Sequence, residues 1–134
     1  MDSTHSDTVL LIEDDAELRS LIKKILQRKG FIVLTAGHGP AALETAKEHD
    51  GTIEVVLADV VMPGMTVAKL HEQLVEICPT TRFIFMSGHS KAEMIRRGVP
   101  ATHTDFVEKP FSNADLADKV REVAEAARAD AASE

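Results

Sequence analysis

Residues 9–15 read Val-Leu-Leu-Ile-Glu-Asp-Asp, four apolar side chains followed directly by three acidic ones. An apolar run of this length is too short for a stable helix and is typical of a strand that is covered on both faces of a parallel sheet. Acidic residues after such a strand lie at its carboxyl end, where open parallel α/β sheets bind their ligands. This stretch therefore predicts both an α/β fold and the place of a polar site.

Four further apolar runs of similar length follow, and each is rich in β-branched or aromatic residues. Together the five runs predict strands at Val9–Ile12, Phe31–Leu34, Ile53–Ala58, Phe83–Met86 and Thr104–Val107. Several of these runs are continuously apolar, which is expected of strands with helices on both sides of the sheet.

Segments with helical periodicity separate the predicted strands. The first ends near Gly30, and its apolar stripe consists of Leu18, Leu21, Ile22, Ile25 and Leu26. Four later segments begin near Pro40, Thr66, Ser90 and Ser112. Because a helix follows each strand, we predict one doubly wound α/β domain with right-handed crossovers and helices on both faces.

The composition excludes several classes of protein. The chain has 134 residues, enough for one domain, and a formal net charge of −7, which argues against nucleic-acid binding. Its single cysteine excludes an internal disulfide and a cysteine-based zinc site, as is usual in a reducing cytoplasm. It has no apolar run of membrane-spanning length and no signal peptide, so we expect no membrane insertion. We expect a domain over 8–127 with flexible termini at 1–7 and 128–134.

Polar side chains follow four of the five predicted strands. Glu13 and Asp14 follow the first, Asp59 the third, Ser87 the fourth and, one residue later, Lys109 the fifth. If the first and third strands are neighbours, two carboxylates about 5 Å apart repel by about 3 kcal/mol at an effective dielectric constant of about 20. A cation relieves this repulsion, and hard oxygen ligands suit Mg²⁺. With a lysine and a hydroxyl nearby, the pattern predicts a phosphoryl site that contains a nucleophilic carboxylate.

Four motifs at these strand ends are similar to those of a known family. They are Val9–Asp15, Leu57–Met65 (Leu-Ala-Asp-Val-Val-Met-Pro-Gly-Met), Phe85–Gly88 (Phe-Met-Ser-Gly) and Phe106–Phe111 (Phe-Val-Glu-Lys-Pro-Phe). In this order they resemble the receiver domain of two-component response regulators, from Thr8 to about Ala126. The residues of these motifs most resemble those in receivers of hybrid histidine kinases or in stand-alone regulators. The resemblance implies a flavodoxin-like (βα)5 fold with strand order 2-1-3-4-5.

The resemblance assigns a role to each acidic residue. Asp59 matches the phosphoacceptor of the family, and Asp14 matches the direct Mg²⁺ ligand. Glu13 matches its neighbour, which acts through water, while Asp59 and the backbone carbonyl of Val61 complete the protein's share of the coordination. The plainer interpretations are a solvated aspartate at position 59 and a helix cap at position 14 or 15, and for Asp15 we favour the cap.

Three further residues match the machinery of the family. Lys109 matches the lysine that contacts the phosphate, and its bond to Pro110 is expected to be cis. Ser87 matches the switch hydroxyl and Phe106 the switch aromatic. The plainer alternatives are a surface lysine, a turn serine before Gly88 and a core phenylalanine.

Two positions beside the site are implied to tune hydrolysis of the acyl phosphate. They are Val61, two residues after Asp59, and His89, two residues after Ser87. Because valine cannot hydrogen-bond an attacking water, the pair predicts a long-lived phosphoryl state. The family usually continues Met-Pro-x-Met with Asp-Gly, whereas here Met65 precedes Thr66-Val67, which leaves the geometry of this loop open.

The resemblance implies a signalling phosphoacceptor that is not an enzyme acting on separate substrates. It would receive its phosphoryl group from a histidine kinase or a histidine phosphotransfer protein and signal to a downstream protein. The switching face, made by helix 4, strand 5 and helix 5, could also support a homodimer. Two alternatives are a Mg²⁺-dependent phosphatase or phosphotransferase with an aspartyl nucleophile, and a receiver-like binding module that is never phosphorylated.

Overall fold

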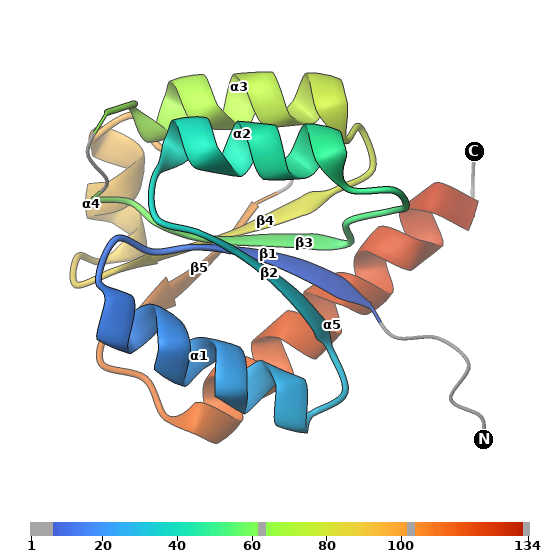
Figure 1. Cartoon of the computed structure of the whole chain (residues 1–134). Coiled ribbons are helices and arrows are strands. Elements are labelled where there is room, and N and C mark those ends of the chain that lie inside the picture. Colours follow the sequence, from blue (N-terminus) through green and yellow to red (C-terminus); the bar gives the residue numbers. More distant parts are fainter. Residues whose placement is uncertain (1–6, 62–63, 102–103, 133–134) are drawn as a thin grey trace.

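The computed structural model describes residues 7–61, 64–101 and 104–132. Strands and helices alternate along the chain (Figure 1). The strands are β1 (Thr8–Ile12), β2 (Ile32–Ala36), β3 (Val55–Asp59), β4 (Arg82–Ser87) and β5 (Thr104–Glu108). The helices are α1 (Ala16–Arg28), α2 (Gly39–Glu48), α3 (Val67–Ile77), α4 (Lys91–Arg96) and α5 (Asn113–Ala132).

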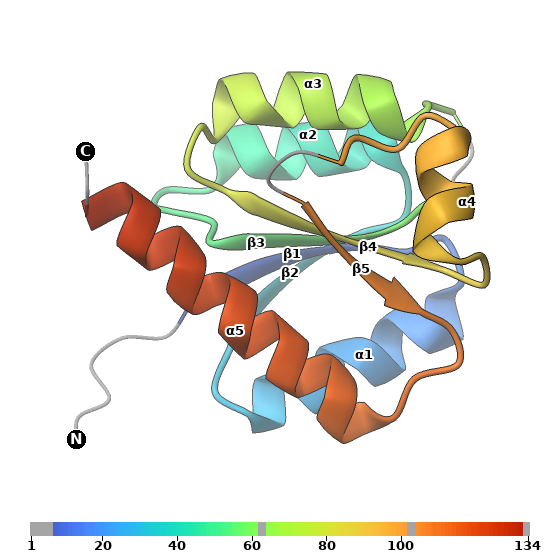
Figure 2. The ribbon, with the colours of Figure 1, turned by 180° about the vertical axis from the view of Figure 1, so that it is seen from behind.

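The strands form one parallel sheet in the order β2-β1-β3-β4-β5, which confirms the predicted topology. Helices α2 and α3 cover one face of the sheet, and α1 and α5 cover the other (Figures 1 and 2). Alternate side chains along each strand point to opposite faces of the sheet. In β1, Leu10 and Ile12 pack toward α2 and α3, whereas Val9 and Leu11 pack toward α1 and α5. The sheet is therefore buried on both sides, as its continuous apolar runs predict.

Two of the strands were predicted to begin too early, at Phe31 and Ile53, although both residues are buried. Phe31 precedes β2, because its N–H donates to the carbonyl of Leu26 and closes the end of α1. Ile53 precedes β3, and its carbonyl accepts the hydroxyl of Thr81 instead of joining the sheet. In both cases an apolar loop residue fills the core beside a strand.

The predicted helix starts are largely confirmed by their caps. Asp15 caps α1 by accepting from the N–H groups of Glu17 and Leu18, and Thr66 and Ser90 cap α3 and α4 in the same way. The predicted apolar stripe of α1 is too wide, because the side chain of Leu21 is 51% exposed at its edge.

The C-terminal part of the described chain is helical and is joined to the rest of the fold by ion pairs. Helix α5 continues to Ala132, so residues 128–132, expected to be flexible, are helical. Arg128 pairs with Asp7 at 3.2 Å, and Asp130 pairs with Arg82 at 3.0 Å. The remaining residues of the predicted flexible termini, 1–6 and 133–134, lie outside the described part of the chain. Among the helices that the structure describes, none has the length and apolar character needed to cross a bilayer.

Candidate functional site

An acidic cluster lies at the carboxyl edge of the sheet, where β1 and β3 run side by side. Glu13, Asp14 and Asp59 each place an oxygen within 4.8 Å of the others. Glu13 and Asp59 are buried, with 2% and 7% of their surface exposed, while Asp14 is exposed. Glu13 and Asp59 are therefore held inside the fold, whereas the carboxylate of Asp14 faces solvent.

The register of the sheet brings these carboxylates together. Ile12 of β1 lies opposite Ala58 of β3. Glu13 and Asp59, the residues that follow them, are therefore neighbours at the carboxyl edge of the sheet. The N–H of Glu13 donates to the carbonyl of Ala36 at 3.1 Å, which extends the β1–β2 ladder to the site. The predicted meeting of the first and third strand ends is confirmed.

Lys109 is the cation of the site. Its Nζ lies 2.8 Å from Oδ2 of Asp59 and 3.8 Å from Oε1 of Glu13. The backbone N–H of Lys109 donates to the carbonyl of Ser87 at 2.7 Å, and the peptide bond from Lys109 to Pro110 is cis, as predicted. Burial acts to lower the pKa of the Lys109 ammonium, but the hydrogen bond to Asp59 and the surrounding negative charges outweigh it and raise this pKa. Lys109 is thus a fixed positive charge.

Glu13 has one oxygen without a hydrogen bond among the described residues. Its Oε2 accepts the N–H of Asp15 at 3.2 Å, whereas its buried Oε1 has no hydrogen bond. Burial first, and then the charge of Asp59, raises the pKa of Glu13 to about 7, against the lowering effects of the Asp15 N–H and Lys109. A buried, unpartnered carboxylate oxygen is costly unless a cation or proton satisfies it.

These observations fit a divalent cation. When all three carboxylates are ionised, the single ammonium leaves two negative charges. The donors are hard oxygens, as Mg²⁺ prefers, and the exposed Asp14 leaves room for the waters that this ion retains. The residues present therefore suit Mg²⁺.

Ser87 lies at the same edge of the sheet, at the end of β4. Its side chain is buried, and its Oγ accepts the N–H of His89 at 3.0 Å. The hydroxyl hydrogen remains available as a donor. The residue is thus held next to the loop that leads into α4.

Phe106 stands further from the carboxylates, on β5. Its ring is half-buried, and its centroid lies 6.3 Å from that of Phe85. Nζ of Lys91, from α4, lies 5.6 Å above the ring. The ring therefore forms part of the contact between β5 and α4, and it packs against the core as well.

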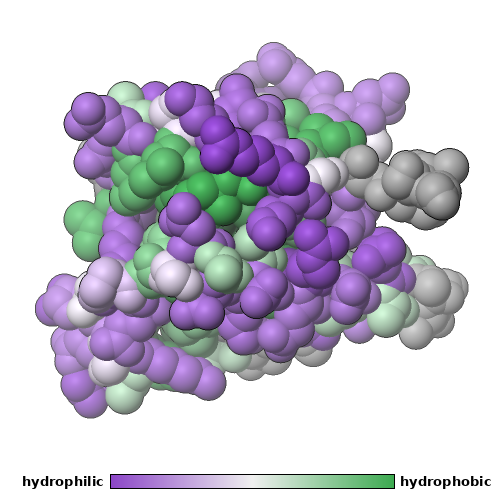
Figure 3. Space-filling view, turned by 90° about the horizontal axis from the view of Figure 1, so that it is seen from below, coloured by the Kyte–Doolittle hydropathy of each residue, from purple (hydrophilic) through white to green (hydrophobic). Residues whose placement is uncertain are grey.

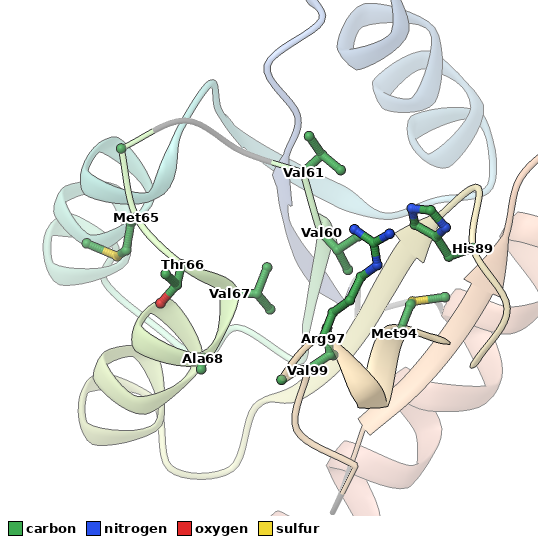
Figure 4. Close-up of a pocket in the computed structure, with 12 residues that line it drawn as sticks. Val60, Val61, Met65, Thr66, Val67, Ala68, His89, Met94, Arg97 and Val99 are labelled. Atoms are coloured by element: carbon green, nitrogen blue, oxygen red, sulfur yellow. The ribbon is translucent and has the colours of Figure 1, made fainter. Parts of the chain in front are cut away.

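Val61 and His89 border a hollow of about 850 Å³ between α3 and α4 (Figure 4). The side chain of Val61 is 68% exposed, while its N–H donates to Oδ1 of Asp59 at 2.8 Å. Most of the hollow is apolar, with Met94 contributed by α4 and Val67 by α3. Both predicted tuning residues therefore border this hollow, and Val61 is joined to Asp59 by its backbone N–H.

The unusual Thr66-Val67 pair is accommodated without strain. Gly64 takes the positive φ of this loop, at +89°. Thr66 is the extended cap of α3, and Val67 is buried in its first turn. The conformational freedom of a glycine is thus not needed at position 67. Met62 and Pro63, part of the motif quoted above, lie outside the described residues.

One residue near the site escaped the sequence analysis. Nη1 of Arg19, from α1, donates to the backbone carbonyl of Glu13 at 2.7 Å. A bond from a side chain to a main-chain carbonyl six residues away leaves no recognisable sequence motif.

Comparison with known proteins gives a consistent result. A profile of the response regulator receiver domain matches residues 9–121. The chain is 38% identical over 125 residues to the sensor kinase CckA of Brucella abortus, covering 92% of this chain but only 13% of that protein. It is 33% identical over 115 residues to the chemotaxis protein CheY of Bacillus subtilis, covering 85% of this chain and 91% of CheY.

Solved structures agree. The receiver domain of the hybrid histidine kinase CckA superposes with a TM-score of 0.74 and 30% identity, over 87% of this chain and 98% of that one. A response regulator receiver protein from Sinorhizobium medicae gives a TM-score of 0.78 with 28% identity, over 93% and 99% of the two chains. The chain thus matches a whole receiver, whereas it spans a small part of the CckA kinase and 48% of the Escherichia coli regulator CpxR.

Proposed function

This chain belongs to the response regulator receiver family and acts in two-component signalling, and from this premise we propose that Asp59 is its phosphoacceptor. The observation that supports this assignment best is the placement of the Asp59 carboxylate, which is buried, bonded to Lys109 at 2.8 Å and next to two further carboxylates. No other aspartate among the described residues combines these features with a place at the carboxyl edge of the sheet.

The chemistry at Asp59 is an in-line phosphoryl transfer from a phosphohistidine. A carboxylate oxygen forms a bond to phosphorus, the bond from phosphorus to the donor nitrogen breaks, and the leaving imidazole keeps the electron pair and takes a proton. The N–H of Val61 and the ammonium of Lys109 hold the two carboxylate oxygens in one orientation. This fixed geometry lowers the entropic part of the barrier.

We assign the Mg²⁺ site to Glu13, Asp14, Asp59 and the backbone carbonyl of Val61. When bound, the ion supplies charge neutralisation for the phosphoryl oxygens. Lys109 provides a second, permanent positive charge beside the acceptor, and Asp14 leaves the site open to the donor. The exposed carboxylate therefore marks the direction from which a phosphohistidine approaches.

Phosphorylation would change the charge at one point and the packing at another. The new group carries up to two negative charges, which Lys109 and the hydroxyl of Ser87 can bind. Moving Ser87 would disturb its bond to the N–H of His89 and hence the loop before α4. Helix α4 has six residues, of which only Met94 is buried, and it borders the hollow in Figure 4. It is therefore the element most easily displaced, with the ring of Phe106 beneath Lys91 moving with it.

Val61 and His89 are proposed to set the lifetime of the phosphoryl group. Val61 presents an apolar, exposed side chain beside Asp59, where a polar residue could orient an attacking water. His89 is the neighbouring group that can hydrogen-bond. One water-orienting group is thus absent, which favours slow hydrolysis.

The proposed partners are a histidine kinase or histidine phosphotransfer protein as donor and a protein target downstream. The side of the molecule formed by α1 and α5 carries a patch of apolar surface among polar residues (Figure 3). Leu21 of α1 is 51% exposed and adds apolar surface to this helix. Such a surface suits contact with a helical donor. We propose a cytoplasmic protein without nucleic-acid contacts, whose own chemistry is limited to its phosphorylation and dephosphorylation, and a homodimer through α4, β5 and α5.

The test is labelling by a small phosphodonor such as acetyl phosphate, followed by intact mass. The wild-type chain should gain one phosphoryl group in the presence of Mg²⁺, and Asp59→Asn should gain none. Asp105→Asn is the matched control, because Asp105 also pairs with a lysine, Lys119, at 3.3 Å but lies outside the acidic cluster. Labelling of Asp59→Asn at the wild-type rate would refute the acceptor assignment.

A further inference from the structure

Arg19 bridges the start of α1 and the end of β1. Its half-buried side chain turns back along the helix, and Nη1 donates to the carbonyl oxygen of Glu13 at 2.7 Å. The bond closes over the short loop that carries Asp14 and Asp15. It thus joins the helix to the backbone of the acidic cluster without touching a carboxylate oxygen.

The Glu13 segment is held at three points. Its N–H donates to the carbonyl of Ala36 at 3.1 Å, and its side chain accepts the N–H of Asp15 at 3.2 Å. Arg19 provides the third point, at the carbonyl. The carbonyl of Glu13 belongs to the peptide that leads into Asp14, so its orientation directs the one exposed carboxylate of the cluster.

Gly37, just after β2, provides the space that Arg19 needs. A Cβ built at Gly37 would lie 3.3 Å from Nη1 of Arg19, closer than an ordinary van der Waals contact. The backbone of Gly37 is not in the left-handed region, so its conformation does not require glycine. Room for the guanidinium is thus a reason for glycine at this position.

We propose that Arg19 is a positioning residue for the metal site: its bond to the Glu13 carbonyl orients Asp14 for coordination of Mg²⁺. The proposal rests on the proposed function only in taking Mg²⁺ as the ion of the acidic cluster. Residues that orient metal ligands from behind typically change metal affinity by about 10- to 100-fold when they are removed.

Electrostatics alone predicts the opposite sign. Arg19 carries a positive charge close to the cluster, and removing it would strengthen the binding of a divalent cation. If Arg19 acts by orienting Asp14, removing it weakens that binding instead. The direction of the change therefore separates positioning from simple charge.

The experiment is an NMR titration of the full chain with MgCl₂, following the amide signals of Asp14 and Asp59. Arg19→Met should raise the Mg²⁺ dissociation constant about tenfold, and Arg19→Lys, which can still donate to the carbonyl, should recover part of the loss. Arg28→Met, at the far end of the same helix, is the charge-matched control and should bind like wild type. Binding by Arg19→Met that equals or exceeds that of wild type overturns the proposal.

Gly37→Ala is a second variant that keeps the charge of Arg19. It should weaken Mg²⁺ binding severalfold in the wild-type background and have no further effect when combined with Arg19→Met. If Arg19→Met does not fold, Gly37→Ala decides alone, and an unchanged dissociation constant then overturns the proposal. Labelling at Asp59 is measured separately at saturating Mg²⁺. Failure of the wild-type chain to be labelled would reject the phosphoacceptor role while leaving the comparison of metal affinities intact.

Discussion

Nζ of Lys109 lies 2.8 Å from Oδ2 of Asp59 but 3.8 Å from Oε1 of Glu13, so one ammonium serves two buried carboxylates unequally. Asp59 receives a hydrogen bond from the lysine, and Glu13 receives only its longer-range charge. Burial and the charge of Asp59 raise the pKa of Glu13 to about 7, and its buried Oε1 accepts no hydrogen bond, so this oxygen is available to a cation. In the function proposed above, Asp59 therefore both attacks phosphorus and binds the metal, while Glu13 serves the metal alone.

Replacing Lys109 should separate metal binding from phosphoryl transfer. In Lys109→Gln the Mg²⁺ affinity should hold or increase, because a competing cation is gone, while the rate of labelling by acetyl phosphate should fall by at least about tenfold. Titration and time-resolved intact mass measure the two effects. Lys119→Gln, which breaks the pair between Lys119 and Asp105, is the control. Parallel losses of both properties would contradict the separation.

Mg²⁺ should stabilise the fold through the acidic cluster. At a concentration ten times its dissociation constant, the ion should raise the free energy of unfolding by about 1.4 kcal/mol. Thermal unfolding followed by circular dichroism is suitable, since the chain has neither tryptophan nor tyrosine for fluorescence. Asp14→Asn should lose the response.

Asp15→Asn is the matched control for this measurement. Asparagine caps a helix as well as aspartate does, and Asp15 is outside the acidic cluster, so α1 and the metal response should both survive. Equal responses from the Asp14 and Asp15 variants would show that the ion acts through general surface charge.

Stability should also depend on pH through His71 of α3. Burial against Phe83, with ring centroids 4.5 Å apart, lowers the pKa of this imidazole from its usual value of 6.5. The unfolded chain then binds the proton more readily than the folded one, so this contribution is complete above pH 6.5 and is lost as the pH falls through the folded-state pKa. The slope can reach about 1.4 kcal/mol per pH unit.

Urea unfolding of wild type and His71→Gln between pH 5 and pH 8 tests this dependence. The two stability curves should run parallel above about pH 7.5 and diverge below about pH 6.5, with the wild-type curve falling more steeply. Curves that remain parallel throughout would exclude a role for His71.

The lifetime of the phosphoryl group should shorten in Val61→Asn. An amide at this exposed position can orient a water toward the phosphorus, while the backbone bond from residue 61 to Asp59 is kept. The half-life of the labelled protein after removal of the donor should drop several-fold relative to wild type. Val61→Ala removes bulk without adding a polar group, and a similar acceleration there would point to steric shielding instead.

The positions of the strands and of the polar residues at their ends were predictable because both depend on local patterns, whereas the strand order 2-1-3-4-5 was implied by the family resemblance. Short apolar runs fix where strands lie, and the polar residue after each run falls at one edge of a parallel sheet. Glu13, Asp59 and Lys109 were therefore brought together as expected.

Strand starts were predicted wrongly where a residue is buried for a reason other than membership of a strand. Phe31 and Ile53 are apolar and buried but lie in loops, and a run of such residues does not mark where a ladder of hydrogen bonds begins. His38 caps α2 through Nδ1, which a list of preferred capping residues would not suggest. The contact of Arg19 with Glu13 joins a side chain to a main-chain atom, and only the fold makes it visible.

The ion pair between Asp7 and Arg128 indicates where a tag can be attached to the protein. It brings the first described residue alongside the last turns of α5, at the edge of the sheet opposite to the acidic cluster (Figure 1). The described chain therefore begins and ends on the side of the domain away from Asp59, and a tag or fluorescent reporter joined before Asp7 or after Ala132 starts from that side. Attachment at these two points should thus suit immobilised phosphotransfer measurements, because both lie away from the acidic cluster.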